Sequence, residues 1–240
     1  MRPSPNHDAR PGGTAVDLLL LHYTGMPTGA AALGRLCDPA AKVSAHYVIE
    51  EDGRTFALVP EAERAWHAGQ AYWQGATDIN ARSIGIELVN PGHEWGYRPF
   101  PEAQMQALLG LAKAIVVRHR IPPERVLGHS DVAPSRKEDP GGLFDWRRLA
   151  GTGLGLWPAD DFVISVQAPV LAAGTSGPAV FDLQLALAAI GYQVEGTASF
   201  DPGTEQAVIA FQRHFRPSRI DGVADQETAS LIHHLAARQA

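Results

Sequence analysis

The segment Val126–Gly141 reads Val-Leu-Gly-His-Ser-Asp-Val-Ala-Pro-Ser-Arg-Lys-Glu-Asp-Pro-Gly, and the rest of the sequence is organised around it. Its first residues are apolar and predict the end of a buried strand, whereas the prolines, glycines and charges after Gly128 predict a loop. His129 and Asp139 lie 139 − 129 = 10 residues apart, too far to share one face of a helix. They can meet only if the loop folds back on itself.

An imidazole and a carboxylate at the end of a strand are two of the three protein ligands of a catalytic zinc site. Asp-Pro-Gly is also a common turn sequence, so a hydrogen-bonded surface histidine remains the alternative for this segment alone. A third ligand has to come from elsewhere in the chain.

A second histidine follows another predicted strand. Val16–Leu21 is a continuous apolar run, which predicts a central strand buried on both faces, and His22 comes directly after it. Polar residues at strand ends of α/β sheets are where sites usually form. We therefore expect His22 to join His129 and Asp139 in an open zinc site, in which the bound water has a pKa of about 7. Taken alone, His22 is equally well explained as a hydrogen-bonded histidine near the core.

Two charged residues are candidates for the chemistry. Glu87 lies in the alternating strand Ser83–Val89, where a carboxylate is costly to bury unpaired; a structural salt bridge is the alternative. Lys137 precedes Asp139 by two residues and shares its face if that piece is extended. Glu87 would take the proton of the water and pass it to a leaving amine, and Lys137 would stabilise an oxyanion. Together with zinc, this is the equipment for hydrolysing an amide.

Five further residues are candidates for substrate binding. His46, in the strand before a predicted hairpin, either faces the site or donates a hydrogen bond behind it. Trp66 and His67 lie in a glycine-containing loop that suits the wall of a groove, although Trp66 could equally seal the core beneath that loop. Whether Asn80 and Arg82 contact the substrate is left open.

Composition narrows the class of protein. A length of 240 residues suits one medium domain and one small one. The net charge of −6 and the lack of a basic tract favour neither nucleic acid nor an anionic membrane surface as partner. Cys37 is the single cysteine, so no internal disulfide framework exists. No apolar run approaches membrane-spanning length.

The last third of the chain differs in character. An internal repeat with an offset of 28 residues relates Ala179–Gln184 to Ala207–Gln212. Helix-start signals at Asp201-Pro202 and Asp225 predict three short helices, over roughly 178–190, 202–215 and 226–237. We expect domains at 1–157 and 169–240, joined by a linker at 158–168, and we expect the small helical domain to be a binding module.

Several segments, in this order, resemble the type-2 zinc N-acetylmuramoyl-L-alanine amidases over roughly residues 4–150. The resemblance implies an α/β domain with a mixed β-sheet flanked by helices, a zinc ion on His22, His129 and Asp139, and Glu87 with Lys137 as the catalytic pair. It also implies cleavage of the amide between N-acetylmuramic acid, or its anhydro form, and the L-alanine of the stem peptide, in cell-wall turnover or recycling. The segments are Leu-Leu-Leu-Leu-His22-Tyr-Thr-Gly, Val-Ser-Ala-His46-Tyr-Val-Ile, Arg-Ala-Trp-His67-Ala-Gly, Asn80-Ala-Arg-Ser-Ile-Gly-Ile-Glu87-Leu and the segment quoted first.

Residues 170–238 resemble the three-helix peptidoglycan-binding domain, which implies peptidoglycan or muropeptides as partners. A metal-free peptidoglycan-recognition protein on the same scaffold is the alternative function. We expect a cytoplasmic location, because the polar, proline-rich start lacks the positive-then-apolar order of a secretion signal. The periplasm or cell envelope is the alternative if an export signal has been removed.

Overall fold

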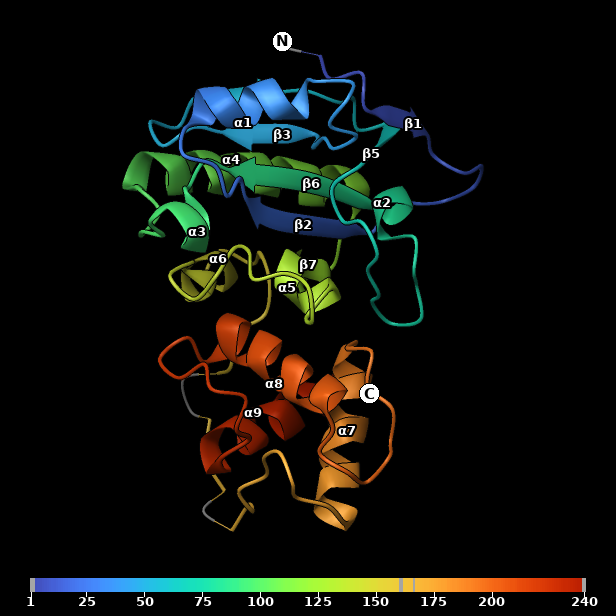
Figure 1. Cartoon of the computed structure of the whole chain (residues 1–240), viewed down its shortest axis with the longest axis vertical. Coiled ribbons are helices and arrows are strands. Elements are labelled where there is room, and N and C mark those ends of the chain that lie inside the picture. Colours follow the sequence, from blue (N-terminus) through green and yellow to red (C-terminus); the bar gives the residue numbers. More distant parts are fainter. Residues whose placement is uncertain (1–2, 160–161, 166, 239–240) are drawn as a thin grey trace. The chain divides into compact units, whose positions relative to one another are not determined.

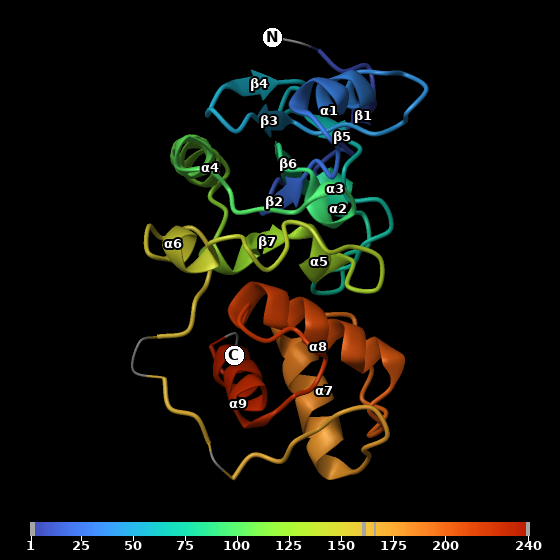
Figure 2. The same ribbon diagram turned by 60° about the vertical axis from the view of Figure 1, so that its left-hand side comes forward.

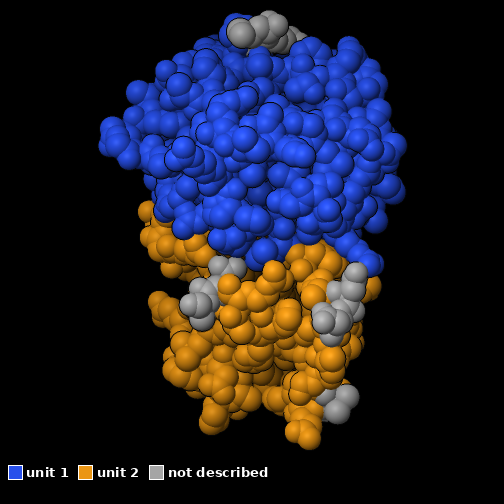
Figure 3. All heavy atoms as spheres, turned by 180° about the vertical axis from the view of Figure 1, so that it is seen from behind, with its two compact units in different colours: residues 1–71, 78–129, 139–156 blue, residues 72–77, 130–138, 157–240 orange. Residues whose placement is uncertain are grey.

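The computed structural model describes residues 3–159, 162–165 and 167–238. It forms two compact units, coloured separately in Figure 3: residues 1–71, 78–129 and 139–156, and residues 72–77, 130–138 and 157–240. Two short segments, 72–77 and 130–138, thus pack within the second unit. The domain boundaries expected at 157 and 169 stay a prediction, and residues 160, 161 and 166 of the expected linker lie outside the described residues.

The first unit is built on a five-stranded sheet of order β4-β3-β6-β2-β7. β3, β6, β2 and β7 run parallel, and β4 is antiparallel to β3, so the sheet is mixed. A separate antiparallel pair joins β1 and β5. The predicted α/β class with a mixed sheet is confirmed. The strands are β1 (His7–Ala9), β2 (Leu18–Tyr23), β3 (Tyr47–Ile49), β4 (Thr55–Ala57), β5 (Glu63–Ala65), β6 (Ser83–Leu88) and β7 (Val126–Gly128).

Helices flank this sheet on both faces. Figures 1 and 2 show α4 on one face of the sheet and α1 on the other. β2 lies between β6 and β7 and is covered on both sides, with each of Leu18–Leu21 at most 1% exposed. This explains why the sequence of β2 is continuously apolar. The helices are α1 (Gly29–Leu36), α2 (Ile79–Arg82), α3 (Gly92–Trp95), α4 (Glu102–His119), the 3₁₀ turn η1 (Pro123–Arg125) and α6 (Trp146–Ala150), while α5 (His129–Val132) begins in the first unit and continues into the second.

Each covering helix is attached to the sheet in its own way. Leu33 and Leu36 of α1 pack in an apolar cluster with Val48 of β3 and with Val89. α4 adds a polar contact, because the buried side-chain amide of Gln104 donates hydrogen bonds to two backbone carbonyls at strand ends. One is the carbonyl of Ile49, the last residue of β3, which also accepts from the backbone N–H of Val89; the other is the carbonyl of Val89, which directly follows β6.

The second unit contains the three helices expected from the sequence. They are α7 (Pro178–Ile190), α8 (Pro202–Phe215) and α9 (Gln226–Ala236), so the predicted bounds are confirmed to within one residue. Asp201 and Asp225 accept from the backbone N–H groups of Thr204 and Thr228, as expected of N-caps.

The internal repeat has a physical role in these helices. Gln184 in α7 and Gln212 in α8 are fully buried, and each accepts from two backbone N–H groups of the loop that follows its helix. Each side-chain amide also donates to the threonine in the first turn of the next helix, Thr204 or Thr228. The repeated glutamine therefore ties each helix to the next.

Among the described residues, we find no helix whose length and apolar character would allow it to cross a membrane.

Replacing Gln104 by methionine tests the polar attachment of α4. We expect the free energy of unfolding to fall by about 1–3 kcal/mol, because the carbonyl of Val89 loses its side-chain donor and that of Ile49 loses one of its two donors. Urea unfolding measures this quantity. Gln106→Met on the same helix is the control, since Gln106 is exposed and donates to the exposed Glu102. Equal losses in the two variants would contradict this role of Gln104.

Candidate metal centre and active site

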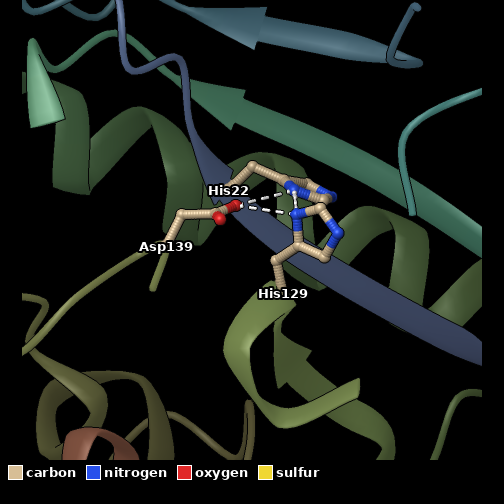
Figure 4. A group of neighbouring side chains, drawn as sticks. All are labelled: His22, His129 and Asp139. Atoms are coloured by element: carbon tan, nitrogen blue, oxygen red, sulfur yellow. Dashed lines mark hydrogen bonds and ion pairs between the residues drawn. The ribbon is translucent and has the colours of Figure 1, made fainter. Parts of the chain in front are cut away.

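His22, His129 and Asp139 come together in the first unit, as Figure 4 shows. His22 lies near the end of β2, His129 follows β7 directly, and Asp139 lies in the loop beyond. The two Nδ1 atoms are 2.9 Å apart, and they lie 2.9 and 3.0 Å from Oδ2 of Asp139. All three side chains are buried. The predicted convergence of these three side chains is confirmed, and their donor atoms lie close enough together to hold a metal ion.

The contacts of His129 determine which of its nitrogens carries the proton. Nε2 lies 3.0 Å from the backbone oxygen of Ala68, and a carbonyl oxygen only accepts. Nε2 therefore donates, and in the neutral ring Nδ1 directs a lone pair at the cluster.

A longer chain of hydrogen bonds assigns His22. The Ser83 hydroxyl donates its one proton to the backbone oxygen of Ile79, so its oxygen accepts from Nε2 of His67. Burial, with the neighbouring His22, lowers the pKa of His67 well below its ordinary value, so this ring is neutral. Nδ1 of His67 then accepts from Nε2 of His22 over 3.0 Å. Neutral His22 is left with a bare Nδ1 that faces His129 and Asp139.

Asp139 completes the set as an anion. Oδ2 of its carboxyl group faces the Nδ1 atoms of both rings. Three lone-pair donors thus lie within 3.0 Å of one another with the protons of both neutral rings directed away. Such an arrangement is repulsive by itself and is relieved by a cation. Two imidazoles and one carboxylate are a donor set that suits zinc.

The ring of His67 needs the space that Gly85 leaves. A Cβ atom at position 85 of β6 would lie 2.6 Å from Cγ and Nδ1 of His67. Asn80 fixes the same region from the other side, because its Oδ1 accepts from the backbone N–H groups of His67 and Ala68. Asn80 therefore orients both groups that hold the ligand histidines, the ring behind His22 and the carbonyl behind His129.

Two protein-family models match this chain. The model of the N-acetylmuramoyl-L-alanine amidase family matches residues 12–142, more than half of the chain, and a putative peptidoglycan-binding domain matches residues 176–232. The chain belongs to the N-acetylmuramoyl-L-alanine amidase family. The resemblance expected from the sequence is confirmed for both parts.

Three relatives show how far the similarity extends. The amidase AmiD of Escherichia coli is 40% identical over 92% of this chain and 82% of its own. Its solved complex with anhydro-N-acetylmuramic acid-L-Ala-D-gamma-Glu-L-Lys covers 95% of this chain and 92% of that one, with a TM-score of 0.80. AmpDh3 of Pseudomonas aeruginosa, solved with an anhydromuramic pentapeptide, is 33% identical at a TM-score of 0.80, over 95% and 94% of the two chains. The 1,6-anhydro-N-acetylmuramyl-L-alanine amidase AmpD of Enterobacter cloacae is 36% identical over 61% of this chain and 86% of its own.

The protein is therefore an amidase, an enzyme that hydrolyses the bond between N-acetylmuramic acid and the L-alanine of the stem peptide. Within its first unit, Glu87 pairs with His22 in the register of the parallel strands β6 and β2. Residues paired in this way project from the same face of the sheet. The catalytic candidate and a metal ligand are thus neighbours, as the sequence suggested for strand ends. Lys137 belongs to the second unit, and its catalytic role stays a prediction.

The structure gives the substrate-binding candidates of the amidase different positions. His67 and Asn80 are buried behind the ligands, as described above. His46 accepts from the backbone N–H of Gly85, and its Nε2 lies 3.1 Å from the backbone oxygen of Glu63, which makes it a buried hydrogen-bonding residue. Its contact with substrate stays an untested prediction.

Trp66 and Arg82 are the two remaining candidates. Trp66 is half-buried, and its backbone N–H donates to Ser44. Arg82 directly precedes β6 and pairs with Asp17. The five residue steps from Arg82 to Glu87 span about 16 Å of extended chain, so a substrate contact of Arg82 has no support from its position.

Sequence reasoning missed a clamp on the loop after Asp139. The Tyr97 hydroxyl donates to the backbone oxygen of Pro140 over 2.7 Å and accepts from the backbone N–H of Leu143. A Cβ atom on Gly141 would lie 2.4 Å from that hydroxyl, and Gly141 has a φ of +82°. Glycine is thus required at position 141 for two reasons: the close approach of the Tyr97 hydroxyl and the positive φ. Only the Pro140-Gly141 pair signalled this turn, and nothing in the sequence pointed to Tyr97.

Gly85→Ala tests the space behind His22. The new methyl group forces His67 to move, and we expect the amidase to bind Zn²⁺ about tenfold or more weakly, as for other partners of metal-bound histidines. Competition with a chromophoric chelator measures the dissociation constant. Gly110→Ala is the matched control, because a Cβ at Gly110 meets nothing within 4 Å. Unchanged affinity in Gly85→Ala would remove His67 from the support of the metal centre.

His46 makes the stability of the amidase depend on pH. Burial lowers the pKa of this ring to about 3, against 6.5 for an exposed histidine. The unfolded chain therefore binds the proton first, and stability is lost as the pH falls from about 6.5 toward 3. From pH 7 to pH 5, wild type should lose about 2 kcal/mol more unfolding free energy than His46→Asn, whose side chain does not titrate. Urea unfolding at the two pH values measures the difference, and equal losses would contradict this origin.

Proposed function

We propose that His22, His129 and Asp139 hold one zinc ion and that this chain uses it to cleave peptidoglycan fragments. The convergence of three lone pairs in a buried site carries the proposal. Without a cation, those lone pairs face one another at 2.9–3.0 Å. A metal-free recognition protein on the same scaffold would have no need for this arrangement.

The residues around the centre have distinct tasks in the proposed mechanism. When bound, a zinc ion supplies a water molecule of lowered pKa and polarises the amide carbonyl. Glu87 takes the proton of the attacking water and passes it to the leaving nitrogen of L-alanine. Lys137 stabilises the negative charge that develops on the carbonyl oxygen. The pairing of Glu87 with His22 across β6 and β2 supports the first role, and the spacing of Lys137 from Asp139 supports the second.

The relatives support a class of substrate. AmiD and AmpDh3 were both solved with anhydromuramic peptides, and AmpD is named for the same linkage. We therefore propose muropeptides, anhydro forms included, as substrates in cell-wall recycling or turnover. The helical part, residues 176–232, would hold peptidoglycan. The cytoplasmic location expected from the sequence remains a proposal, which fractionation of native cells tests.

Glu87→Gln separates catalysis from metal binding. The amide side chain is isosteric but takes up no proton at neutral pH, so we expect turnover to fall by about 10²–10⁴-fold while zinc content is unchanged. Mass spectrometry of the products follows turnover, with release of the intact stem peptide expected. Glu195→Gln, at an exposed glutamate of the second unit, is the control. Full activity of Glu87→Gln would exclude Glu87 from the mechanism.

Metal removal tests the zinc proposal independently. Elemental analysis should find one zinc per chain, and dialysis against a chelator should abolish cleavage until Zn²⁺ is restored. Peptidoglycan binding without zinc and without cleavage would support the recognition protein instead.

A further inference from the structure

Asp131 is a buried carboxylate two residues after His129, and the mechanism does not use it. It is 1% exposed and lies in the single turn of α5 that His129 begins. Both of its oxygens are engaged within the second unit. The Tyr192 hydroxyl donates to Oδ1 over 2.8 Å, and Nδ1 of His214 lies 2.8 Å from Oδ2.

The partners of Asp131 come from a distant part of the chain. Tyr192 follows α7 and His214 lies in α8, both inside the match to the peptidoglycan-binding domain, whereas Asp131 lies inside the match to the amidase. Tyr192 is 1% and His214 2% exposed. Burial, together with Asp131, raises the pKa of Tyr192 well above its ordinary value, so its hydroxyl keeps its proton and donates. A buried carboxylate with two such partners is costly to displace.

Other contacts hold the same region of the second unit. The backbone N–H of Tyr72 donates to the oxygen of Val132 over 2.8 Å. The adjoining Trp73 packs edge-on against Tyr192, and a Cβ atom on Gly191 would lie 2.5 Å from its indole ring. Segments 72–77 and 130–138 are thus fitted to the end of α7 by hydrogen bonds and by close packing.

The position of segment 130–138 gives these contacts a consequence. The segment is bounded on one side by His129 and on the other by Asp139, so its conformation sets the separation of two metal ligands. It contains one turn of helix and no strand. An unanchored segment of this kind would have to be ordered by the metal itself, at a cost to binding.

We propose that Asp131, Tyr192 and His214 are positioning residues of the amidase. By anchoring segment 130–138, they prepare His129 and Asp139 for the metal. The helical part of the chain then has two tasks, since besides holding peptidoglycan it stabilises the loop that joins two metal ligands. The inference rests on the proposed zinc site.

Tyr192→Phe in the full-length protein tests the anchor, because it removes the hydrogen bond and keeps the ring against Trp73. We expect faster hydrogen exchange of the amides of residues 130–138 in the metal-free protein, and Zn²⁺ binding weakened about three- to tenfold. Asp131→Asn should act in the same direction and more strongly. Because the defect lies in metal affinity, saturating Zn²⁺ should restore most of the lost turnover, which would not happen in a misfolded protein.

Two controls separate the anchor from general effects. Tyr47→Phe removes another hydroxyl-to-carboxylate bond, to Glu61 in the first unit. Val180→Ala creates a cavity at a fully buried position of α7, about 15 Å along the helix from its Tyr192 end. The proposal would be overturned if Tyr192→Phe and Asp131→Asn both showed the same hydrogen exchange of residues 130–138 and the same Zn²⁺ affinity as these controls. Failure of wild type to bind zinc would instead overturn the proposed metal site, so the two failures are distinguishable.

Discussion

The structure depends on the direction in which two imidazole protons point. Each ligand histidine donates its proton away from the centre, to a carbonyl oxygen behind His129 and to a second imidazole behind His22. The lone pairs on the two Nδ1 atoms are therefore directed toward Asp139. Much of the first unit can be understood as support for this orientation, from the glycine that makes room for His67 to the asparagine that fixes the backbone at residues 67 and 68.

Parallel strands bring the parts of the site to one edge. β2, β6 and β7 run in the same direction, so residues near their carboxyl ends meet there although they are far apart in the sequence. His22, Glu87 and His129 all use this geometry. Asp139 differs, because it reaches the cluster through a loop that Tyr97 clamps on its far side. The site thus combines a rigid sheet edge with a loop that needs its own fixation.

Sequence patterns correctly predicted the elements that depend on residues close together in the chain. The apolar run before His22, the alternation around Glu87 and the caps at Asp201 and Asp225 each predicted an element that the structure contains. The outer partners of the ligands were not predictable in the same way. The carbonyl of Ala68 carries no side-chain signal, and Ser83 acts only through its position beside His67. The packing of residues 72–77 and 130–138 within the second unit depends on contacts with residues more than 50 positions away, such as Tyr192, which no local pattern records.

The excursion of the chain into the second unit begins directly after one metal ligand and ends directly before another. An ion bound by both His129 and Asp139 would therefore link the two ends of segment 130–138 and close a small ring of backbone. Closing this ring restricts the conformations of the loop between the two residues. Zinc would then have a structural effect besides its chemistry, by tying together the two residues that flank segment 130–138.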